Sequence, residues 1–315
     1  MKILTLCYEY PPIGGGGGKV VAGLTQELAR QGEQVDVLTM HYDHLPYRRI
    51  IQGVQVFSAP CIRLHKEICT PFEMLTYLIT AFPIALKLIQ QNKYELIHAH
   101  FIFPDGVLAN FLKKITGIPY ILTAHGSDVP GYNPHRFQLE HRLLLPLWKR
   151  IVQESAFTVT ASDRLADLIH QYLPHQPIQR IYNAFSPPLL SNKPKNPLHI
   201  LTVTRLFERK GIQYLIQALD GVTTPYQVDI IGAGPYQSAL ESLARSIHTN
   251  AKITFHGWID HQDPRFWELM ETAAIFVFPS EEENFPMVLL EAMAAQMAII
   301  TTNNSGCAEV VGDAG

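Results

Sequence analysis

Cysteine is scarce in this chain of 315 residues, and the cysteines that are present form no recognisable pattern. Cys7, Cys61, Cys69 and Cys307 include no C-x-x-C pair and no regular spacing. A zinc site and a disulfide framework are therefore not expected, and a reducing, cytoplasmic compartment fits best. The N-terminus has no features of a secretory leader either. MKILTLCYEY has neither a basic start nor a cleavage site of small residues, and it predicts a first strand.

Two other missing features narrow the class of protein. Lys and Arg number 25 against 28 Asp and Glu, a net charge of −3, so there is no electrostatic reason to bind nucleic acid. No apolar run reaches the roughly 20 uninterrupted residues of a spanning helix. The most apolar segment, 72–89, is interrupted by Glu73, Thr76, Thr80 and Pro83. It predicts a mostly buried helix rather than a membrane span.

Apolar residues make up 47% of the chain, enough for two domains with separate cores. Short apolar runs alternate with helical patterns, as in a doubly wound α/β fold with parallel sheets. The expected strands of the first half are Ile3–Cys7, Val35–Thr39, Glu95–Ala99, Tyr120–Thr123 and Phe157–Thr160. Its expected helices are Val20–Arg30, Phe72–Gln90, Gly106–Ile115 and Arg136–Gln153.

A proline-rich segment divides the chain. It predicts an N-terminal Rossmann-like domain over 1–185, a linker over 186–197 and a C-terminal Rossmann-like domain over 198–315. In the second domain we expect strands His199–Thr204, Gln227–Ile231, Lys252–His256, Ile275–Phe278 and Ala298–Thr301. The expected helices are Ile212–Leu219, Tyr236–Ile247, Pro264–Glu271 and Pro286–Ala295, followed by a loop, SGCAEVVGDAG. Two such domains would place their strand ends on either side of a ligand-binding cleft.

A glycine-rich loop, PPIGGGGGKV, lies between the first strand and the first helix. Glycines such as Gly16 and Gly17 let the backbone approach a ligand and direct N–H groups at an anion. The loop does not match the ATP-binding P-loop, because Ile13 stands where glycine is needed and Val20 replaces Ser or Thr. It does not match G-x-G-x-x-G either, because Lys19 takes the last glycine's place. An ATPase or an NAD enzyme is therefore disfavoured.

Charged residues follow strands of the second domain. Arg205 and Lys210, in VTRLFERKG, are two cations in a loop that opens a helix, and they suit a diphosphate; a solvated surface loop is the alternative. In FPSEEENFPMVLLEAMA, Glu283 would lie at a helix N-terminus. Glu291 would lie within that helix among apolar residues. A carboxylate in such a position needs hydrogen-bond donors, and the hydroxyl groups of a sugar are suitable ones.

The strand end YILTAHGSD in the first domain places His125 and Asp128 just after a buried strand. Both side chains are expected to project toward the cleft. A buried structural histidine is the alternative for His125.

These motifs together resemble glycosyltransferase family 4, the retaining nucleotide-sugar enzymes of GT-B fold. The resemblance covers nearly the whole chain and rests on PP-x-GGGG, HAHF, TAHGSD, R-x-x-x-x-KG, IGAGP, FHGWI and the E-x₇-E pair Glu283 and Glu291. It implies a hexosyltransferase-type enzyme of glycan or cell-envelope biosynthesis. The first domain would lie on the acceptor side, and the second would bind the nucleotide-diphosphate sugar.

The resemblance also implies roles for particular residues. Arg205 and Lys210 would bind the donor pyrophosphate, with Gly16 and Gly17 supporting phosphate or acceptor. Glu291 would bind the ribose, and Gly257 and Trp258 would border the nucleobase. The donor sugar would contact Glu283 and the backbone of Asn284, Phe285 and Pro286, and His125 would lie beside it. The chain has no D-x-D motif, so neither a metal nor another cofactor is implied.

The chain departs from the family pattern at several positions. Asn284 stands where glycine is usual, in a turn that asparagine tolerates because it accepts positive φ. Gln296 and Ala298 replace Gly-x-Pro, and Thr204 replaces the glycine before Arg205. The second domain also lacks the family's last helices, which predicts a truncated chain. Two alternatives therefore stay open, a sugar-nucleotide 2-epimerase-like enzyme and an inactive truncated chain.

The helix expected over 136–153 is the candidate for the acceptor side. Its apolar stripe consists of Leu143, Leu144, Leu147, Trp148, Ile151 and Val152. Its basic positions are His135, Arg136, Arg142, Lys149 and Arg150. The alternatives are an ordinary core helix with a solvated basic side and a peripheral contact with the inner membrane face that carries a lipid-linked acceptor.

Overall fold

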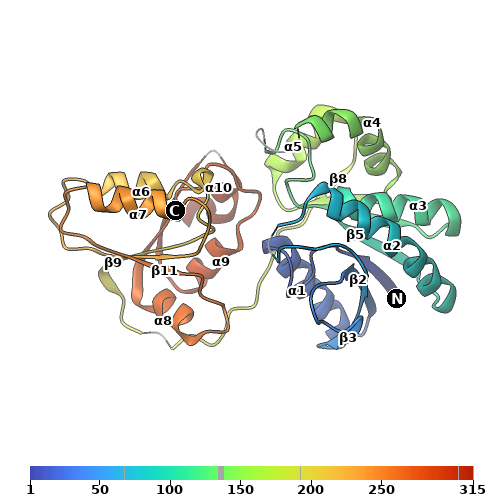
Figure 1. The fold of residues 1–315 in the computed structure, drawn as a ribbon, viewed down its shortest axis with the longest axis horizontal. Coiled ribbons are helices and arrows are strands. Elements are labelled where there is room, and N and C mark those ends of the chain that lie inside the picture. The colour runs from blue at the N-terminus through green and yellow to red at the C-terminus, as the bar shows by residue number, and fades with distance from the viewer. Residues whose placement is uncertain (67, 134–137, 192, 304, 315) are drawn as a thin grey trace. The chain divides into compact units, whose positions relative to one another are not determined.

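The computed structural model describes residues 1–315 except 67, 134–137, 192, 304 and 315. It comprises two compact units, unit 1 (Met1–Ala184) and unit 2 (Phe185–Gly315). Each contains one β-sheet with helices packed around it (Figure 1). This α/β architecture with two largely parallel sheets is the predicted fold class.

Unit 1 contains an eight-stranded sheet in the order β3-β4-β2-β1-β5-β6-β7-β8. The strands are β1 (Lys2–Leu6), β2 (Gln34–Met40), β3 (Arg48–Ile51), β4 (Val54–Ala59), β5 (Leu96–His100), β6 (Tyr120–Ala124), β7 (Phe157–Thr160) and β8 (Ile178–Arg180). All neighbouring pairs are parallel except β3 and β4. The β3–β4 hairpin was not predicted, because the half-exposed β3 lacks the continuous apolar run of a buried parallel strand.

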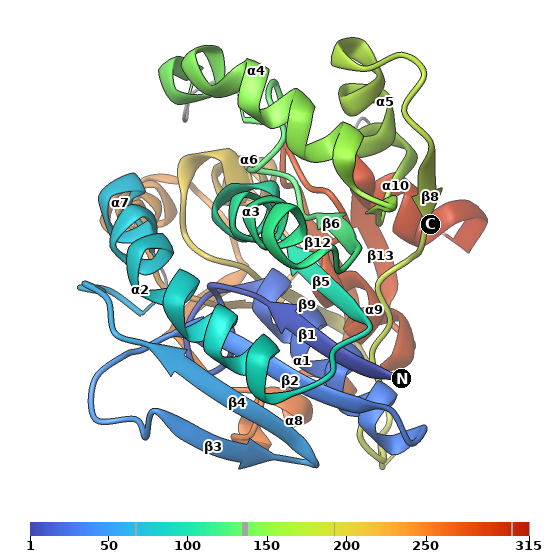
Figure 2. The same ribbon diagram turned by 90° about the vertical axis from the view of Figure 1, so that its right-hand side faces the viewer.

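Helices α2 and α3 lie over one face of this sheet and α1 lies over the other (Figure 2). The helices of unit 1 are α1 (Gly16–Arg30), α2 (Pro71–Gln91), α3 (Val107–Thr116), α4 (Gln138–Glu154) and α5 (Asp163–Tyr172), with a π-helical turn at Ile102–Gly106. The first turn of α2 is stabilised by a capping box: Thr70 accepts from the Glu73 amide, and Glu73 accepts from that of Thr70.

The prediction that α2 is mostly buried is wrong. By length and composition α2 could cross a membrane, with a mean hydropathy of 1.6, but only 28% of that window is buried in the structure. The buried positions form a single stripe, Glu73, Tyr77, Ala81, Ala85 and Leu88. Phe72, Leu75 and Ile79 are 53–65% exposed. An apolar composition therefore did not imply burial, because the sheet covers only one side of the helix.

Helix α4 also differs from the prediction. Trp148, Ile151 and Val152 are fully buried, but Leu143 and Leu144 are 70% and 41% exposed, so the predicted apolar stripe extends beyond the core contact. Arg150 Nε donates to Glu154 Oε1 at 2.7 Å, and Arg142 is exposed. His135 and Arg136 lie outside the described residues.

Unit 2 contains a five-stranded parallel sheet in the order β11-β10-β9-β12-β13. The strands are β9 (Asn196–Val203), β10 (Gln227–Ile231), β11 (Lys252–Gly257), β12 (Ala273–Phe278) and β13 (Ala298–Thr301). The helices are α6 (Ile212–Ala218), α7 (Gln237–Ser246), α8 (Pro264–Thr272), α9 (Met287–Ala294) and α10 (Gly306–Val311). The prediction of a loop in SGCAEVVGDAG is wrong, because helix α10 forms there. Ser305 is its N-cap, and the Ser305 side chain accepts a hydrogen bond from the Cys307 amide.

Candidate active site

A small pocket of about 60 Å³ lies at the carboxyl ends of β9 and β10 in unit 2. Arg205, Trp258 and His261 are among its lining residues. Gly232, of the IGAGP segment, also lines it. A Cβ at Gly232 would lie 1.8 Å from the Thr204 carbonyl oxygen, and its φ is +139°, so only glycine lets these two loops approach so closely. The sequence-predicted Arg205 and Trp258 therefore share one pocket.

Lys210 and Glu283 form an ion pair near the same sheet edge. Lys210 ends the short 3₁₀ turn Glu208–Lys210 and is only 6% exposed. Its Nζ pairs with Glu283 Oε1, which also accepts from Ser280 Oγ at 2.8 Å. Burial lowers the pKa of Lys210, and the Glu283 carboxylate offsets part of that shift. The structure thus joins two predicted site residues that the sequence placed in separate motifs.

Glu291 lies on the buried side of α9 and is 7% exposed. Its Oε1 is 3.1 Å from His261 Nε2, and within the described part of the chain its buried Oε2 has no hydrogen-bond partner. Leaving a buried carboxylate oxygen unpaired is costly unless a ligand donates to it. His261 was not predicted, because a lone histidine in the sequence IDHQD gives no signal of its partner.

The segment Asn284–Pro286 is buried and leads directly into α9. A Cβ at Gly306 would lie 1.7 Å from the Asn284 carbonyl oxygen, and the Gly306 amide donates to the Glu283 carbonyl at 2.9 Å. Asn284 is not among the described residues with φ above zero, so this turn does not depend on the tolerance of asparagine for positive φ. Gln296 does have positive φ, +58°, just after the end of α9.

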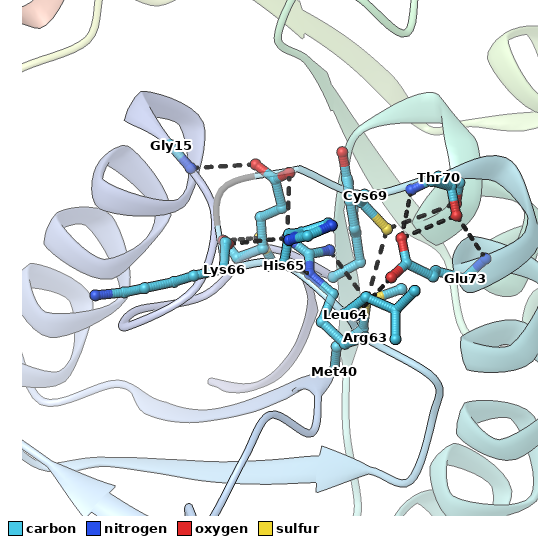
Figure 3. A network of polar contacts seen from close by, with 12 residues as sticks. Gly15, Met40, Arg63, Leu64, His65, Lys66, Cys69, Thr70 and Glu73 are labelled. Atoms are coloured by element: carbon cyan, nitrogen blue, oxygen red, sulfur yellow. Dashed lines mark hydrogen bonds and ion pairs between the residues drawn. The ribbon is translucent and has the colours of Figure 1, made fainter. Parts of the chain in front are cut away.

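In unit 1 the glycine loop is held by neighbouring polar groups (Figure 3). The Gly14 amide donates to the Lys66 carbonyl at 2.9 Å, and the Gly15 amide donates to Glu9 Oε2 at 3.3 Å. The solvent-shielded Arg63 side chain donates to the carbonyls of His65 and Lys66 at 2.8 and 3.2 Å. The segment before α2 therefore holds the loop in place, and α1 begins at Gly16.

Gly17 faces the aromatic cluster at the ends of β5 and β6. A Cβ at Gly17 would lie 2.7 Å from Phe101 Cζ and 3.5 Å from His125 Nδ1, so a side chain there would displace the Phe101 ring. The Phe101 and His125 rings are 4.4 Å apart. The predicted residues Gly17 and His125 are thus neighbours in space.

Asp128 does not project from the strand end as expected. Its buried carboxylate accepts from the backbone amides of Ile102, His125 and Gly126 at 2.8, 3.1 and 2.8 Å. The short side chain of aspartate readily turns back to accept from backbone amides two or three residues earlier in the chain. Asp128 therefore positions His125.

His125 is the end of a row of three histidines that includes two residues of β5. His100 Nδ1 is 3.1 Å from His125 Nε2, and the rings of His98 and His100 are 4.1 Å apart. Burial lowers the pKa of His98 to about 4 and that of His125 to about 3, and that of His100 lies well below its usual value. All three imidazoles are therefore neutral near pH 7. Across the described residues, no three His, Cys, Asp or Glu side chains are placed to hold a metal ion.

Comparison of the sequence with models of known protein families identifies the family of this chain. The model of Glycosyltransferase Family 4 matches residues 14–189, and the model of Glycosyl transferases group 1 matches residues 190–315. The chain belongs to glycosyltransferase family 4. Its two parallel-sheet units are those of the GT-B fold, as the sequence predicted.

Characterised and uncharacterised glycosyltransferases resemble this family 4 chain over nearly its full length. An uncharacterised glycosyltransferase of Methanocaldococcus jannaschii is 29% identical, covering 99% of this chain and 83% of the relative. N-acetyl-alpha-D-glucosaminyl L-malate synthase of Bacillus anthracis is 26% identical, covering 100% and 82%. This family 4 protein is accordingly a glycosyltransferase.

Solved structures share the fold of this glycosyltransferase. Sucrose-phosphate synthase from Thermosynechococcus elongatus superposes with a TM-score of 0.79 at 20% identity, covering 97% of this chain and 82% of that one. Anabaena HepE, solved in complex with UDP-glucose, superposes with a TM-score of 0.70 at 16% identity, covering 98% and 82%.

Proposed function

We propose that this glycosyltransferase moves a hexose from a nucleotide-diphosphate sugar to a glycan or lipid-linked acceptor, with retention of anomeric configuration, in glycan or cell-envelope biosynthesis. The observation that carries the proposal is the buried Oε2 of Glu291, which has no hydrogen-bond partner among the residues that the structure describes. His261 links this carboxylate to the pocket that Arg205 and Trp258 line. A carboxylate, a cation and an aromatic ring suit a ribose, a diphosphate and a base.

The proposed roles follow from the chemistry of each group. Arg205 and Lys210 bind the diphosphate, Glu291 accepts from the ribose hydroxyls, and Gly257 and Trp258 border the nucleobase. Glu283 contacts the donor sugar, as does the backbone of Asn284, Phe285 and Pro286. Glu283 is already engaged by Lys210 and Ser280, which suits a positioning role better than attack on the sugar. Gly16, Gly17 and His125 of unit 1 serve phosphate, sugar or acceptor.

We further propose that transfer needs no metal or other cofactor. The leaving diphosphate develops negative charge in the transition state, and Arg205 and Lys210 supply the stabilising positive charge. Transfer activity is expected to persist in excess EDTA within about twofold of its value with added Mg²⁺. Loss of activity in EDTA, restored by Mg²⁺ or Mn²⁺, would contradict this.

The first experiment identifies the donor. Each of a panel of nucleotide sugars is added to the protein, and the true donor is expected to raise the melting temperature most, because binding to the native state alone stabilises it by about 2.7 kcal/mol at 100 times Kd. Labelled donor is then incubated with glycan and lipid acceptors. The proposal is supported if the label is transferred to an acceptor and the sugar of an α-linked donor is again α-linked in the product.

The same assay separates the alternatives. Interconversion of the nucleotide sugar without an acceptor would identify an epimerase. Donor binding without turnover or hydrolysis would identify an inactive chain.

We also propose a peripheral contact with an anionic membrane surface. Two observations on unit 1 support it: Phe72, Leu75 and Ile79 form an exposed apolar stripe on α2, and α4 exposes Leu143 beside Arg142. Exposed apolar side chains next to cations are typical of helices that lie in a membrane interface.

Sedimentation with anionic liposomes at low and high salt tests this contact. Replacing Phe72, Leu75 and Ile79 by Ser is expected to remove most binding at both salt concentrations, since each side chain contributes about 1–2 kcal/mol on burial. Replacing Arg142, Lys149 and Arg150 by Ala is expected to weaken only the low-salt binding, and Arg150 contributes least because it pairs with Glu154. Ile300→Ser, at a position 59% exposed in unit 2, is the matched control. Negligible binding of the unmodified protein at low salt would refute the contact.

A further inference from the structure

His100 is a buried residue that the proposed function does not use. It ends β5 and is 1% exposed. Its Nδ1 lies 3.1 Å from His125 Nε2, so one of these nitrogens must carry the proton of the bond between them. Which one carries it decides how His125 presents its other nitrogen.

The second nitrogen of His100 indicates the answer. His100 Nε2 is buried and has no hydrogen-bond partner among the residues that the structure describes. A proton on Nε2 would leave a buried N–H unsatisfied, which is rarer and more costly than a bare lone pair. The proton of His100 therefore belongs on Nδ1, from which it is donated to His125 Nε2.

The consequence falls on the far side of the His125 ring. With Nε2 as the acceptor from His100, a neutral His125 carries its own proton on Nδ1. Nδ1 faces the glycine loop, 3.5 Å from the position of a Cβ at Gly17. Burial keeps the pKa of both His100 and His125 well below 7, so both rings are neutral and each carries a single ring proton.

We propose that His100 is a positioning residue that holds His125 in the Nδ1–H tautomer, so that His125 presents a hydrogen-bond donor, not an acceptor, toward the glycine loop. The substrate consequence rests on the proposed function: a donor at this place suits an oxygen of the sugar or of a phosphate. The tautomer itself does not depend on which substrate is used.

The test reads the tautomer directly in protein labelled with ¹⁵N-histidine, using long-range ¹H–¹⁵N correlation spectra without substrate. In the unmodified protein, His125 is expected to show a protonated Nδ1 and an unprotonated Nε2. His100→Leu removes the donor and is expected to shift His125 toward the Nε2–H form. His100→Asn, which places an amide N–H near the original Nδ1, is expected to keep the Nδ1–H form.

His98→Leu is the matched control. His98 is on the same strand, and its ring centroid lies 4.1 Å from that of His100, but its Nε2 bonds to Thr123 Oγ1 at 2.9 Å. This variant is expected to leave the His125 tautomer unchanged.

The kinetic readout separates positioning from structure. For His100→Leu we expect kcat to fall about 10- to 100-fold with a KM for the donor within about threefold, and for His100→Asn to recover most of the rate. An Nε2–H tautomer in the unmodified protein would overturn the proposal even if His100→Leu did not fold. So would an unchanged His125 tautomer in folded His100→Leu. If the tautomers behave as expected but no nucleotide sugar is turned over, the proposed function fails and the tautomer assignment stands.

Discussion

Lys210→Ala is expected to weaken binding of a nucleoside diphosphate about 10- to 150-fold, the equivalent of losing charge-assisted bonds of about 1.5–3 kcal/mol. The probe is the nucleoside diphosphate that raises the melting temperature of the unmodified protein most, and titration calorimetry measures its affinity. Lys210 is 6% exposed and paired with Glu283, so its loss also leaves a carboxylate without its partner. We expect this to destabilise unit 2 by about 3 kcal/mol, at the lower end for buried pairs because the Glu283 side chain keeps 15% exposure.

Two further variants separate the loss of binding from the loss of stability. The double variant Lys210→Met, Glu283→Gln removes both charges, so its melting temperature is expected to recover while diphosphate binding stays weak. Arg205→Ala removes an exposed cation and is expected to weaken binding without lowering the melting temperature. If folded Lys210→Ala bound the diphosphate like the unmodified protein, the donor site would not be at this loop.

Glu291→Gln is expected to weaken binding of the same nucleotide about 5- to 100-fold with little change in melting temperature. Gln keeps the shape of Glu and an oxygen for His261, but a neutral amide accepts from two ribose hydroxyls less strongly than a carboxylate, by about 1 kcal/mol or more for each bond. Isothermal titration measures the affinity, and thermal unfolding measures the stability.

The 2′,3′-dideoxy form of the nucleotide provides the sharpest control for Glu291. Because this ligand has no ribose hydroxyls, the unmodified protein and Glu291→Gln are expected to bind it equally well, which closes a thermodynamic cycle between the carboxylate and the hydroxyls. Equal losses of affinity for both nucleotides would assign Glu291 a role other than ribose binding. A lower melting temperature with unchanged affinity would make it structural.

The regular elements were largely predictable from local pattern. The strand Gln227–Ile231, for example, was predicted with its observed bounds, since its buried apolar residues Val228, Ile230 and Ile231 are close together in the sequence and the strand is flanked by turns. Strand β3 was missed because it is the exposed edge strand of the sheet, where this pattern is weak. Strand β4 was missed although it lies inside the sheet and Val54, Val56 and Ala59 are buried. Helix α10 was missed because it is only six residues long and begins with glycine.

Burial was less predictable than secondary structure. Leu143 and Leu144 continue the apolar pattern of α4 and α2 is apolar along its length, yet both helices expose large side chains. Which apolar side chains of a helix are buried depends on the elements that pack against it in the folded unit. The hydropathy pattern of the helix alone does not identify those elements.

The types of residue at the candidate site could be predicted from the sequence, because each motif follows a strand or opens a helix and therefore reaches the carboxyl edge of a sheet. The contact partner of each residue could not be predicted. Glu283 pairs with a lysine 73 positions earlier, and Glu291 lies beside a histidine 30 positions earlier. Asp128, two residues beyond Gly126, turned back to its own backbone. Spacing along the chain specifies helices and strands, since their hydrogen bonds and faces repeat every few residues. The Lys210–Glu283 pair and the Glu291 Oε2, which has no partner among the described residues, instead depend on segments that are distant in the sequence and meet only in the packed unit.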